Sequence, residues 1–312
     1  MKPQPLKNLR LPVIVAPMFL NSSPDLVVSA AKAGILATFP SLNPRAPEEL
    51  TDWLDEIESR CNEENQSRHR YGVNLIVHKT NEKLETHKKT VVDKRVPVVV
   101  TSLGAANDVI SDIQSYGGIV LHDVINRRHA EKAIEAGVDG LVLVSAGAGG
   151  HGGTLNPLSF IAEIREIFDG IIVLAGGISC GRGVAAARAA GADFAYMGTR
   201  FIATNEATAD AEYKQMLIDS RAADVIYTNS VSGVNGNFLR QSIEANNIDL
   251  TIAPDYKPGA MRQKDKKSAA WKRVWSGGHG VGTIHNVVPV ADLVDQLEHE
   301  FDEAIADLLV KK

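Results

Sequence analysis

The fold of this chain of 312 residues is decided by two stretches, Ala175-Gly176-Gly177-Ile178-Ser179 and Met197-Gly198-Thr199-Arg200-Phe201. Apolar runs at residues 170–174 and 193–197 lead into them, a pattern typical of buried parallel strands. An Ala-rich helical pattern over residues 182–190 separates the two. Because glycine carries no side chain, successive strand ends of this kind leave several backbone N–H groups directed at one anion. The pattern predicts a phosphate-bearing cofactor or substrate.

These glycines have two other possible explanations. Either glycine corner alone is explained equally well by a tight turn between a strand and a helix, but two in succession favour phosphate binding. A Rossmann domain is disfavoured because no G-x-G-x-x-G opens a helix after the first strand. The acidic residue that would meet a ribose is also not in its expected place.

Eight apolar segments alternate with helical patterns along most of the chain. The predicted strands are residues 11–15, 35–39, 71–75, 96–100, 118–122, 140–144, 170–174 and 193–197. The predicted helices are residues 25–33, 47–58, 79–92, 105–115, 126–136, 157–168, 181–190, 207–222 and 290–310. This alternation indicates an α/β fold of the (β/α)8 TIM barrel type with a smaller inserted lid domain. We assign residues 1–222 and 286–312 to the barrel and residues 223–285, where the alternation breaks, to the lid.

Composition and charge exclude several classes of protein. With 44% hydrophobic and 23% charged residues the chain is an ordinary globular protein. Its net charge of −5 argues against nucleic acid as a partner. Cys61 and Cys180 do not form a C-x-x-C pair, which excludes a disulfide framework or a cysteine-rich zinc site and fits a reducing cytosol. No apolar run approaches the length of a signal core or a membrane span, so we expect a cytoplasmic protein that does not bind membranes.

The loop after the sixth strand contains the strongest candidate for a catalytic side chain. Residues 147–153 hold five glycines around His151, so backbone can approach a flat ligand while the imidazole projects toward it. Imidazole titrates near neutrality and serves as a base or a donor. His122 at the fifth strand end and His279 in the lid are weaker candidates.

Other catalytic motifs are absent from the sequence. We find no His-x-x-x-His pair, acidic metal cluster, Gly-x-Ser-x-Gly or paired carboxylates at the strand ends, and predict no metal. A redox cofactor explains how a single histidine suffices. The basic run at residues 262–267, continued by Lys272 and Arg273, is either a solvated face of the lid or a site that attracts an acidic partner or anionic ligand.

The motifs as a set resemble the nitronate monooxygenase family, once called 2-nitropropane dioxygenases. The resemblance rests on Ala16-Pro17-Met18, Asn74, Ala148-Gly149-Gly150-His151-Gly152 and the two glycine stretches, in this order. It extends over nearly the whole chain, including residues 275–282. The A-G-G-H-x-G loop together with the two glycine corners is fairly specific, although each motif alone is weak.

This resemblance implies an FMN-containing barrel covered by an extra domain. It implies oxidation of alkyl nitronates, such as propionate 3-nitronate, by dioxygen to a carbonyl compound and nitrite. His151 is the implied catalytic residue, acting as a base in members that also accept neutral nitroalkanes. The implied cofactor-binding residues are Pro17, Met18, Asn74, Gly149, Gly176, Gly177, Gly198 and Thr199. The expected partners are a small nitronate or nitroalkane and dioxygen, and a homodimer is compatible with the sequence.

The sequence also departs from the family pattern and leaves alternatives open. Residues 142–145 lack the acidic residue that many relatives carry, and His122-Asp123 replaces a strand end that bears lysine in some members. The roles of His122, Asp123 and His279 stay open. An NAD(P)H-dependent FMN reductase, resembling enoyl-acyl-carrier-protein or quinone reductases, is the first alternative. A barrel that binds a phosphorylated ligand without redox chemistry is the second.

Overall fold

The computed structural model describes six segments of the chain, residues 4–45, 49–62, 69–78, 80–104, 107–251 and 272–310. Eight parallel strands form a closed barrel in the order β1-β2-β3-β4-β5-β6-β8-β9. Their bounds are β1 Val13–Val15, β2 Leu36–Pro40, β3 Tyr71–Ile76, β4 Val98–Ser102, β5 Ile119–Val124, β6 Gly140–Val144, β8 Ile171–Ala175 and β9 Phe194–Met197. Pairing of Ile14 with Tyr196 joins the first strand to the last and closes the ring. The predicted (β/α)8 barrel is confirmed.

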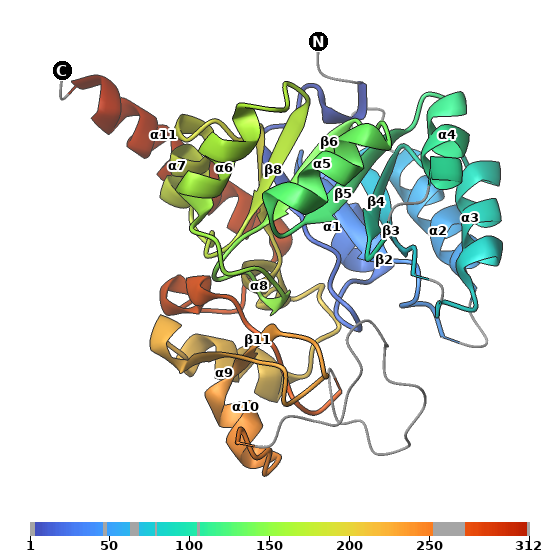
Figure 1. The fold of residues 1–312 in the computed structure, drawn as a ribbon. Helices are drawn as coiled ribbons and strands as arrows, with labels where there is room; N and C mark the ends of the chain where they lie inside the picture. The colour runs from blue at the N-terminus through green and yellow to red at the C-terminus, as the bar shows by residue number, and fades with distance from the viewer. Residues whose placement is uncertain are drawn as a thin grey trace.

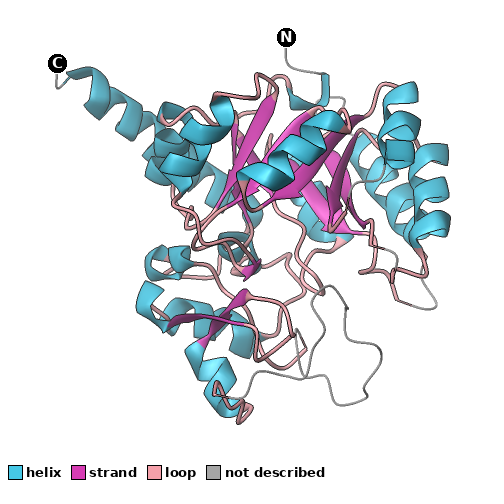
Figure 2. Ribbon diagram, in the orientation of Figure 1, coloured by secondary structure: helices cyan, strands magenta, loops and turns pink. Residues whose placement is uncertain are grey.

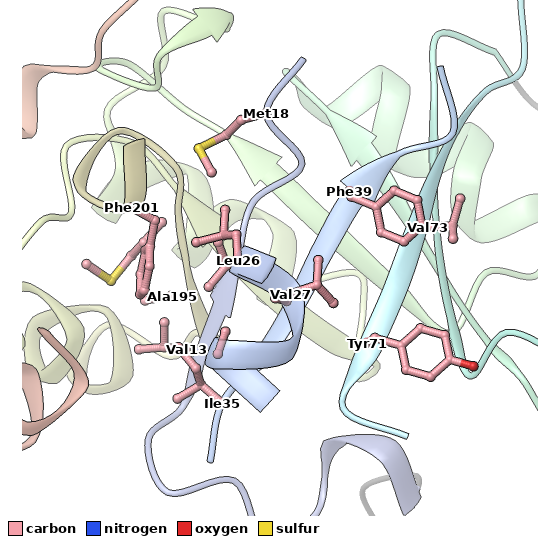
Figure 3. Packing of buried hydrophobic residues seen from close by; sticks show 14 of the residues in the cluster. Val13, Met18, Leu26, Val27, Ile35, Phe39, Tyr71, Val73, Ala195 and Phe201 are labelled. Carbon is pink, nitrogen blue, oxygen red and sulfur yellow. The ribbon is translucent and has the colours of Figure 1, made fainter. Parts of the chain in front are cut away.

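The strands form because their side chains are buried on both faces. In β4, Val98 and Val100 pack inside the barrel, while Val99 packs into the layer between the barrel and the surrounding helices. Successive side chains of a strand point to opposite faces, so a strand buried on both faces reads as a continuous apolar run. Figure 3 shows part of the outer layer, which includes Val27 and Phe39.

Helices surround the barrel and alternate with its strands (Figures 1 and 2). The helices of the barrel are α1 Pro24–Lys32, α2 Leu50–Asn62, α3 Leu84–Asp93, α4 Asn107–Ser115, α5 Arg127–Glu135, α6 Pro157–Arg165, α7 Gly181–Ala189 and the short α8 Thr199–Ile202. Caps fix several of their starts; Ser23, for example, accepts a hydrogen bond from the Leu26 N–H at 3.2 Å. The short α8 was not predicted, and the predicted helix starts at residues 47, 79 and 105 lie outside the described residues.

The C-terminal helix α11, Val290–Val310, packs against α7 and α1. The approach to α7 is close, because a Cβ atom on Gly181 would lie 2.2 Å from the Leu297 carbonyl oxygen. The sequence predicts one apolar stripe along the whole helix, and Leu297 is buried as expected. Leu308 is 60% exposed, because the last turns extend beyond the barrel (Figure 1). The predicted packing is therefore wrong for the end of this helix.

A second, three-stranded sheet lies below the barrel in the orientation of Figure 2, in the order β10-β11-β7. Its strands are β10 Val225–Thr228, β11 Gly236–Leu239 and β7 Gly150–His151, and α9 Ala211–Asp219 and α10 Arg240–Ala245 accompany them. Its small apolar core contains Val231, Phe238, Ile243 and Val274. The strand β7 belongs to the loop after the sixth barrel strand, so the barrel itself contributes to this sheet. The domain boundaries at residues 222/223 and 285/286 stay a prediction.

Two further predictions concern residues near this sheet. The helix predicted at residues 207–222 is shorter, because α9 begins after Asp210 and ends before Ser220, whose backbone is extended. The basic run at residues 262–267 lies outside the described residues. None of the helices in the described segments is long and apolar enough to cross a membrane.

Candidate active site

A cavity with a volume of about 400 Å³ opens at the carboxyl ends of the barrel strands. This is the end of a (β/α)8 barrel at which active sites are found, and the volume lies within the range of small-molecule pockets. Residues from nearly every strand end and from the small sheet surround it. Its lining includes Pro17, Met18, Asn74, Asp123, Gly149, His151, Gly176, Gly177, Tyr196, Gly198, Thr199 and Tyr213. Every residue predicted to bind the cofactor or to act in catalysis therefore reaches one cavity.

The glycines after β8 are required by the backbone itself. Gly176 has φ of +139°, and a Cβ atom there would lie 2.2 Å from Ser145 Oγ. Gly177 has φ of +68°, but nothing in the described chain lies closer than 4.0 Å to its added Cβ atom. By contrast, a Cβ atom on Gly198 would make only ordinary contacts, the nearest 3.5 Å away. The first corner is therefore a sterically constrained turn that leaves space on its cavity side.

The backbone N–H groups at the two corners are not all available to a ligand. The Gly177 N–H donates to the Gly147 carbonyl at 3.2 Å, so this amide is already used. Within the described part of the chain, the N–H groups of Gly176, Gly198 and Thr199 donate no hydrogen bond. Unpaired N–H groups beside a cavity suit an anion such as a phosphate. The N–H groups of Gly176, Gly198 and Thr199 are thus available to a ligand in the described chain, whereas the Gly177 N–H holds the loop at Gly147.

Thr199 connects the second corner to the segment that follows the small sheet. Its Oγ1 accepts a hydrogen bond from the Gly278 N–H at 3.0 Å, which leaves the hydroxyl proton able to donate toward the cavity. Gly149 packs against the same pair, because a Cβ atom on it would lie 2.9 Å from Thr199 Oγ1 and 3.0 Å from Gly278 N. The glycine at position 149 therefore permits three chain segments to meet at the donor-rich side of the cavity.

Pro17 and Met18 follow β1 and form an apolar part of the lining. The Met18 N–H donates to Ser22 Oγ at 2.9 Å, and the Met18 carbonyl accepts from Asn43 Nδ2 at 3.1 Å. Met18 itself is only 8% exposed, and Figure 3 shows its side chain beyond the end of the first strand. These hydrogen bonds fix a loop whose side chains can cover the face of a flat ligand.

His151 lies in β7 and is held in place by the small sheet. Its backbone pairs with Gly236 of β11, and its Nε2 lies 3.2 Å from Ser232 Oγ. Ser232 donates its own hydroxyl proton to the Val234 carbonyl at 2.9 Å. Nε2–H is therefore the donor toward Ser232, which places the imidazole lone pair on Nδ1.

The protonation state of His151 follows from its surroundings. His151 is exposed at the open cavity, and the chain segments around the ring hydrate it less well than bulk water does. This partial desolvation lowers the pKa of His151 below its usual 6.5. At neutral pH the ring is uncharged and can accept a proton.

The other two histidine candidates do not reach the cavity lining. His122 lies in β5 with its Nδ1 2.7 Å from Thr101 Oγ1, and burial lowers its pKa to about 4. His279 is exposed and packs against Gly147, whose carbonyl accepts the His279 N–H at 2.9 Å. His279 thus helps to hold the loop that carries His151, a role that the sequence did not indicate.

Three polar side chains joined by hydrogen bonds, Asn74, Ser102 and Asp123, lie across the barrel from the glycine corners. Asn74 Nδ2 donates to Ser102 Oγ at 2.7 Å and to the Val100 carbonyl at 3.1 Å. Ser102 Oγ donates in turn to Asp123 Oδ2 at 2.6 Å. Burial raises the pKa of Asp123 from 3.8 to about 6, and the Ser102 hydrogen bond opposes this rise. From the sequence alone the role of Asp123 is open, and Ser102 is not singled out.

The described lining contains no lysine or arginine, and its titratable groups are Asp123, His151, Tyr196 and Tyr213. Burial raises the pKa of Tyr213 to about 12 and that of Tyr196 well above its ordinary value. Asp123 is thus the one described lining residue that carries charge near neutral pH. In the described residues, no three His, Cys, Asp or Glu side chains are grouped to hold a metal ion.

Comparison with known proteins agrees with this architecture. The family model for nitronate monooxygenase matches residues 39–300. A nitronate monooxygenase from Paraburkholderia phytofirmans is 31% identical over 217 residues, which cover 64% of this chain and 59% of that relative. A probable nitronate monooxygenase from Staphylococcus saprophyticus is 27% identical over 87% of this chain and 90% of its own length.

Solved structures share the fold. Nitroalkane oxidase from Streptomyces ansochromogenes has a TM-score of 0.80 at 24% identity, covering 97% of this chain and 99% of its own. A FabK mutant from Thermotoga maritima has a TM-score of 0.80 at 23% identity, covering 97% of both chains. The fold, the cavity and the matched family together define a (β/α)8-barrel oxidoreductase. The chain belongs to the nitronate monooxygenase family.

Proposed function

We propose that this protein is an FMN-dependent nitronate monooxygenase. It would oxidise alkyl nitronates with dioxygen to a carbonyl compound and nitrite. The observation that carries the proposal is one cavity that joins a donor-rich glycine corner to a neutral histidine. Membership of the family supports the same activity.

The residues present fit FMN. The phosphate would be held by the Thr199 hydroxyl and by the N–H groups of Gly176, Gly198 and Thr199, which donate no hydrogen bond among the described residues. Pro17 and Met18 offer an apolar surface for the ring, and Asn74 lies on the far side of the cavity. When bound, the flavin supplies the electron transfer and the reaction with dioxygen.

His151 would act as the base for neutral nitroalkane substrates. Its uncharged ring carries a lone pair on Nδ1, because Nε2–H is directed at Ser232. It would take the proton from the carbon next to the nitro group and so form the nitronate. A substrate that enters as the nitronate has already lost this proton, so its oxidation would depend less on His151.

The decisive experiment is an absorption spectrum of the purified protein, followed by anaerobic addition of ethylnitronate and, separately, of NADH or NADPH. We expect a flavin spectrum that is reduced by ethylnitronate, with release of nitrite once air is admitted. Bleaching by a nicotinamide nucleotide but not by ethylnitronate would replace the proposal with an FMN reductase. A colourless protein that binds another phosphate ester would replace it with a barrel without redox chemistry.

A further inference from the structure

The two polar parts of the cavity lie on opposite sides of the barrel. In the ring of eight strands, β3 is four positions from β8, and β4 is four positions from β9. Asn74 and Ser102, on β3 and β4, therefore lie across the cavity mouth from the corners that follow β8 and β9. A ligand whose phosphate is held at the corners and which spans the mouth would bring its other end to these residues.

The hydrogen-bond direction at Asn74 is fixed by the backbone. The Val100 carbonyl can only accept, so the Asn74 atom 3.1 Å from it is the amide nitrogen. The second hydrogen of the same nitrogen goes to Ser102 Oγ. Both amide hydrogens are used, and Asn74 Oδ1 has no partner within the described chain. Asn74 can therefore only accept a hydrogen bond from a ligand.

Asp123, like Asn74, has an oxygen that can accept a hydrogen bond from a ligand. Ser102 uses its one hydroxyl proton on Asp123 Oδ2, at 2.6 Å. Asp123 Oδ1 is buried and has no hydrogen-bond partner in the described residues, although Asp123 lines the cavity. A buried carboxylate oxygen without a partner is costly, because the protein gives nothing in exchange for its lost hydration. A ligand that donates a hydrogen bond would relieve this cost.

We propose that Asn74, Ser102 and Asp123 form an acceptor subsite that binds the imide N–H of the flavin ring. This inference rests on the FMN proposed above and gives Asp123 and Ser102 a role in binding it. The isoalloxazine ring carries one imide N–H, which can donate a hydrogen bond to one acceptor oxygen such as Asp123 Oδ1. Asp123 would receive this N–H, and Ser102 would hold the carboxylate in position as a positioning residue.

Charge supports this assignment of the two ends of the ligand. Asp123 faces a cavity whose other described titratable groups are His151, Tyr196 and Tyr213, none of them cationic at neutral pH. A phosphate or carboxylate would be repelled there, whereas an N–H donor is attracted. The anionic end of the ligand is thus directed to the glycine corners and the donor end to Asp123.

The test compares FMN with 3-methyl-FMN, in which a methyl group replaces the imide hydrogen. Dissociation constants are measured with apoprotein by the quenching of flavin fluorescence. We expect the native protein to bind FMN at least about tenfold more tightly than 3-methyl-FMN, since the analogue leaves a buried acceptor unpaired. Asp123→Ala should reduce this ratio to below about threefold.

Two further variants keep the outcome interpretable. Ser102→Ala retains the carboxylate but frees it to rotate, and should lower the ratio as well. Asp112→Asn is the charge control, because it removes one carboxylate charge as Asp123→Ala does. Asp112 lies on the outer surface of α4, where it pairs with Lys88 at 3.1 Å, so this variant should leave the ratio unchanged. Equal binding of the two flavins by the native protein would overturn the acceptor subsite alone. Failure to bind FMN at all would overturn both this inference and the proposed function.

Discussion

The two ends of the cavity differ in the direction of their hydrogen bonds. After β8 and β9 the polar groups are backbone N–H donors, and those of Gly176 and Gly198 donate no hydrogen bond within the described chain. Near the ends of β3, β4 and β5 the polar groups are side-chain acceptors, and Asn74 and Asp123 each have an oxygen without a partner among the described residues. One end therefore suits an anion and the other an N–H group.

Opposite hydrogen-bonding character at the two ends allows one barrel mouth to orient a long ligand. A backbone corner supplies donors whatever its sequence, provided that its φ angles and close contacts are tolerated, which is why glycine occupies it. Acceptors directed inward need particular side chains held by their neighbours. The donor end therefore depends on backbone shape and the acceptor end on the identity of its side chains. Mutations at the two ends should consequently have different effects.

The largest expected effect lies between the two ends, at His151. His151→Ala should lower the rate with a neutral nitroalkane by about 10²- to 10⁴-fold, because the proton acceptor is lost. Flavin content should not change, since neither end of the cavity is altered. Stopped-flow reduction by nitroethane and by ethylnitronate measures the two steps separately. An equal loss with both substrates would show that the imidazole does not act as the base.

Breaking the donor end should have the next largest effect. Gly176→Ala introduces a Cβ atom 2.2 Å from Ser145 Oγ at φ of +139°. We expect a loss of about 3 kcal/mol in the free energy of unfolding, with loss of flavin binding of about 100-fold. Urea unfolding and flavin fluorescence measure these quantities.

Gly177→Ala is the matched control for this substitution. In the part of the chain that the structure describes, its added Cβ atom has no neighbour closer than 4.0 Å, so only its φ of +68° is strained. This costs about 1–2 kcal/mol. If both variants lost the same stability, the contact with Ser145 would not be what requires glycine at position 176.

The acceptor end should be visible in the pH dependence of stability. Burial raises the folded-state pKa of Asp123 from 3.8 to about 6, so ionisation disfavours the folded state. Stability is lost as pH rises from about 4 to about 6 and stays lost above that range. Asp123→Asn removes the charge and should stabilise the apoprotein by about 1–3 kcal/mol at pH 8 but not at pH 4, on the scale of about 1.4 kcal/mol per pKa unit.

Urea unfolding at the two pH values measures this effect, with Asp112→Asn as the surface control. The control should change stability by less than about 0.5 kcal/mol at both pH values. A variant Asp123→Asn that is less stable than the native protein at pH 8 would contradict the buried-charge explanation.

The smallest expected effect concerns the hydroxyl group of the donor end. Thr199→Val keeps the shape of the side chain but removes the acceptor for the Gly278 N–H and a donor toward the phosphate. We expect a five- to tenfold loss of FMN affinity, corresponding to about 1 kcal/mol for a hydrogen bond. Thr199→Ser retains the hydroxyl and should restore binding. Equal affinities of the valine and serine variants would exclude a role for the hydroxyl group.

Much of the fold was predictable from local sequence. Buried parallel strands appear as apolar runs such as residues 96–100, and their regular spacing with helices indicated the barrel. The glycine corners and His151 could be found because strand ends converge on one face of a barrel. The protein family was also recognisable from these motifs, and the family model confirms it.

The small sheet could not be predicted in the same way. β7 has two residues, and its pairing partner β11 lies far along the chain, so no local pattern marks it. The shortened α9 and the exposed end of α11 likewise depend on where neighbouring elements end. The lid boundaries at residues 223 and 285 stay a prediction.

The order of strands and helices, the two glycine corners and the histidine beside them can be read from local sequence, because backbone sterics and hydrophobic burial act locally. Which polar groups lack partners in the described chain depends on how distant segments pack. The N–H groups of Gly177 and His279 both donate to the Gly147 carbonyl. The register of β4 on β5 brings Ser102 to Asp123. Hydrogen-bond partners and the loss of water around a carboxylate are set by contacts between distant segments, and those contacts exist only once the barrel has closed.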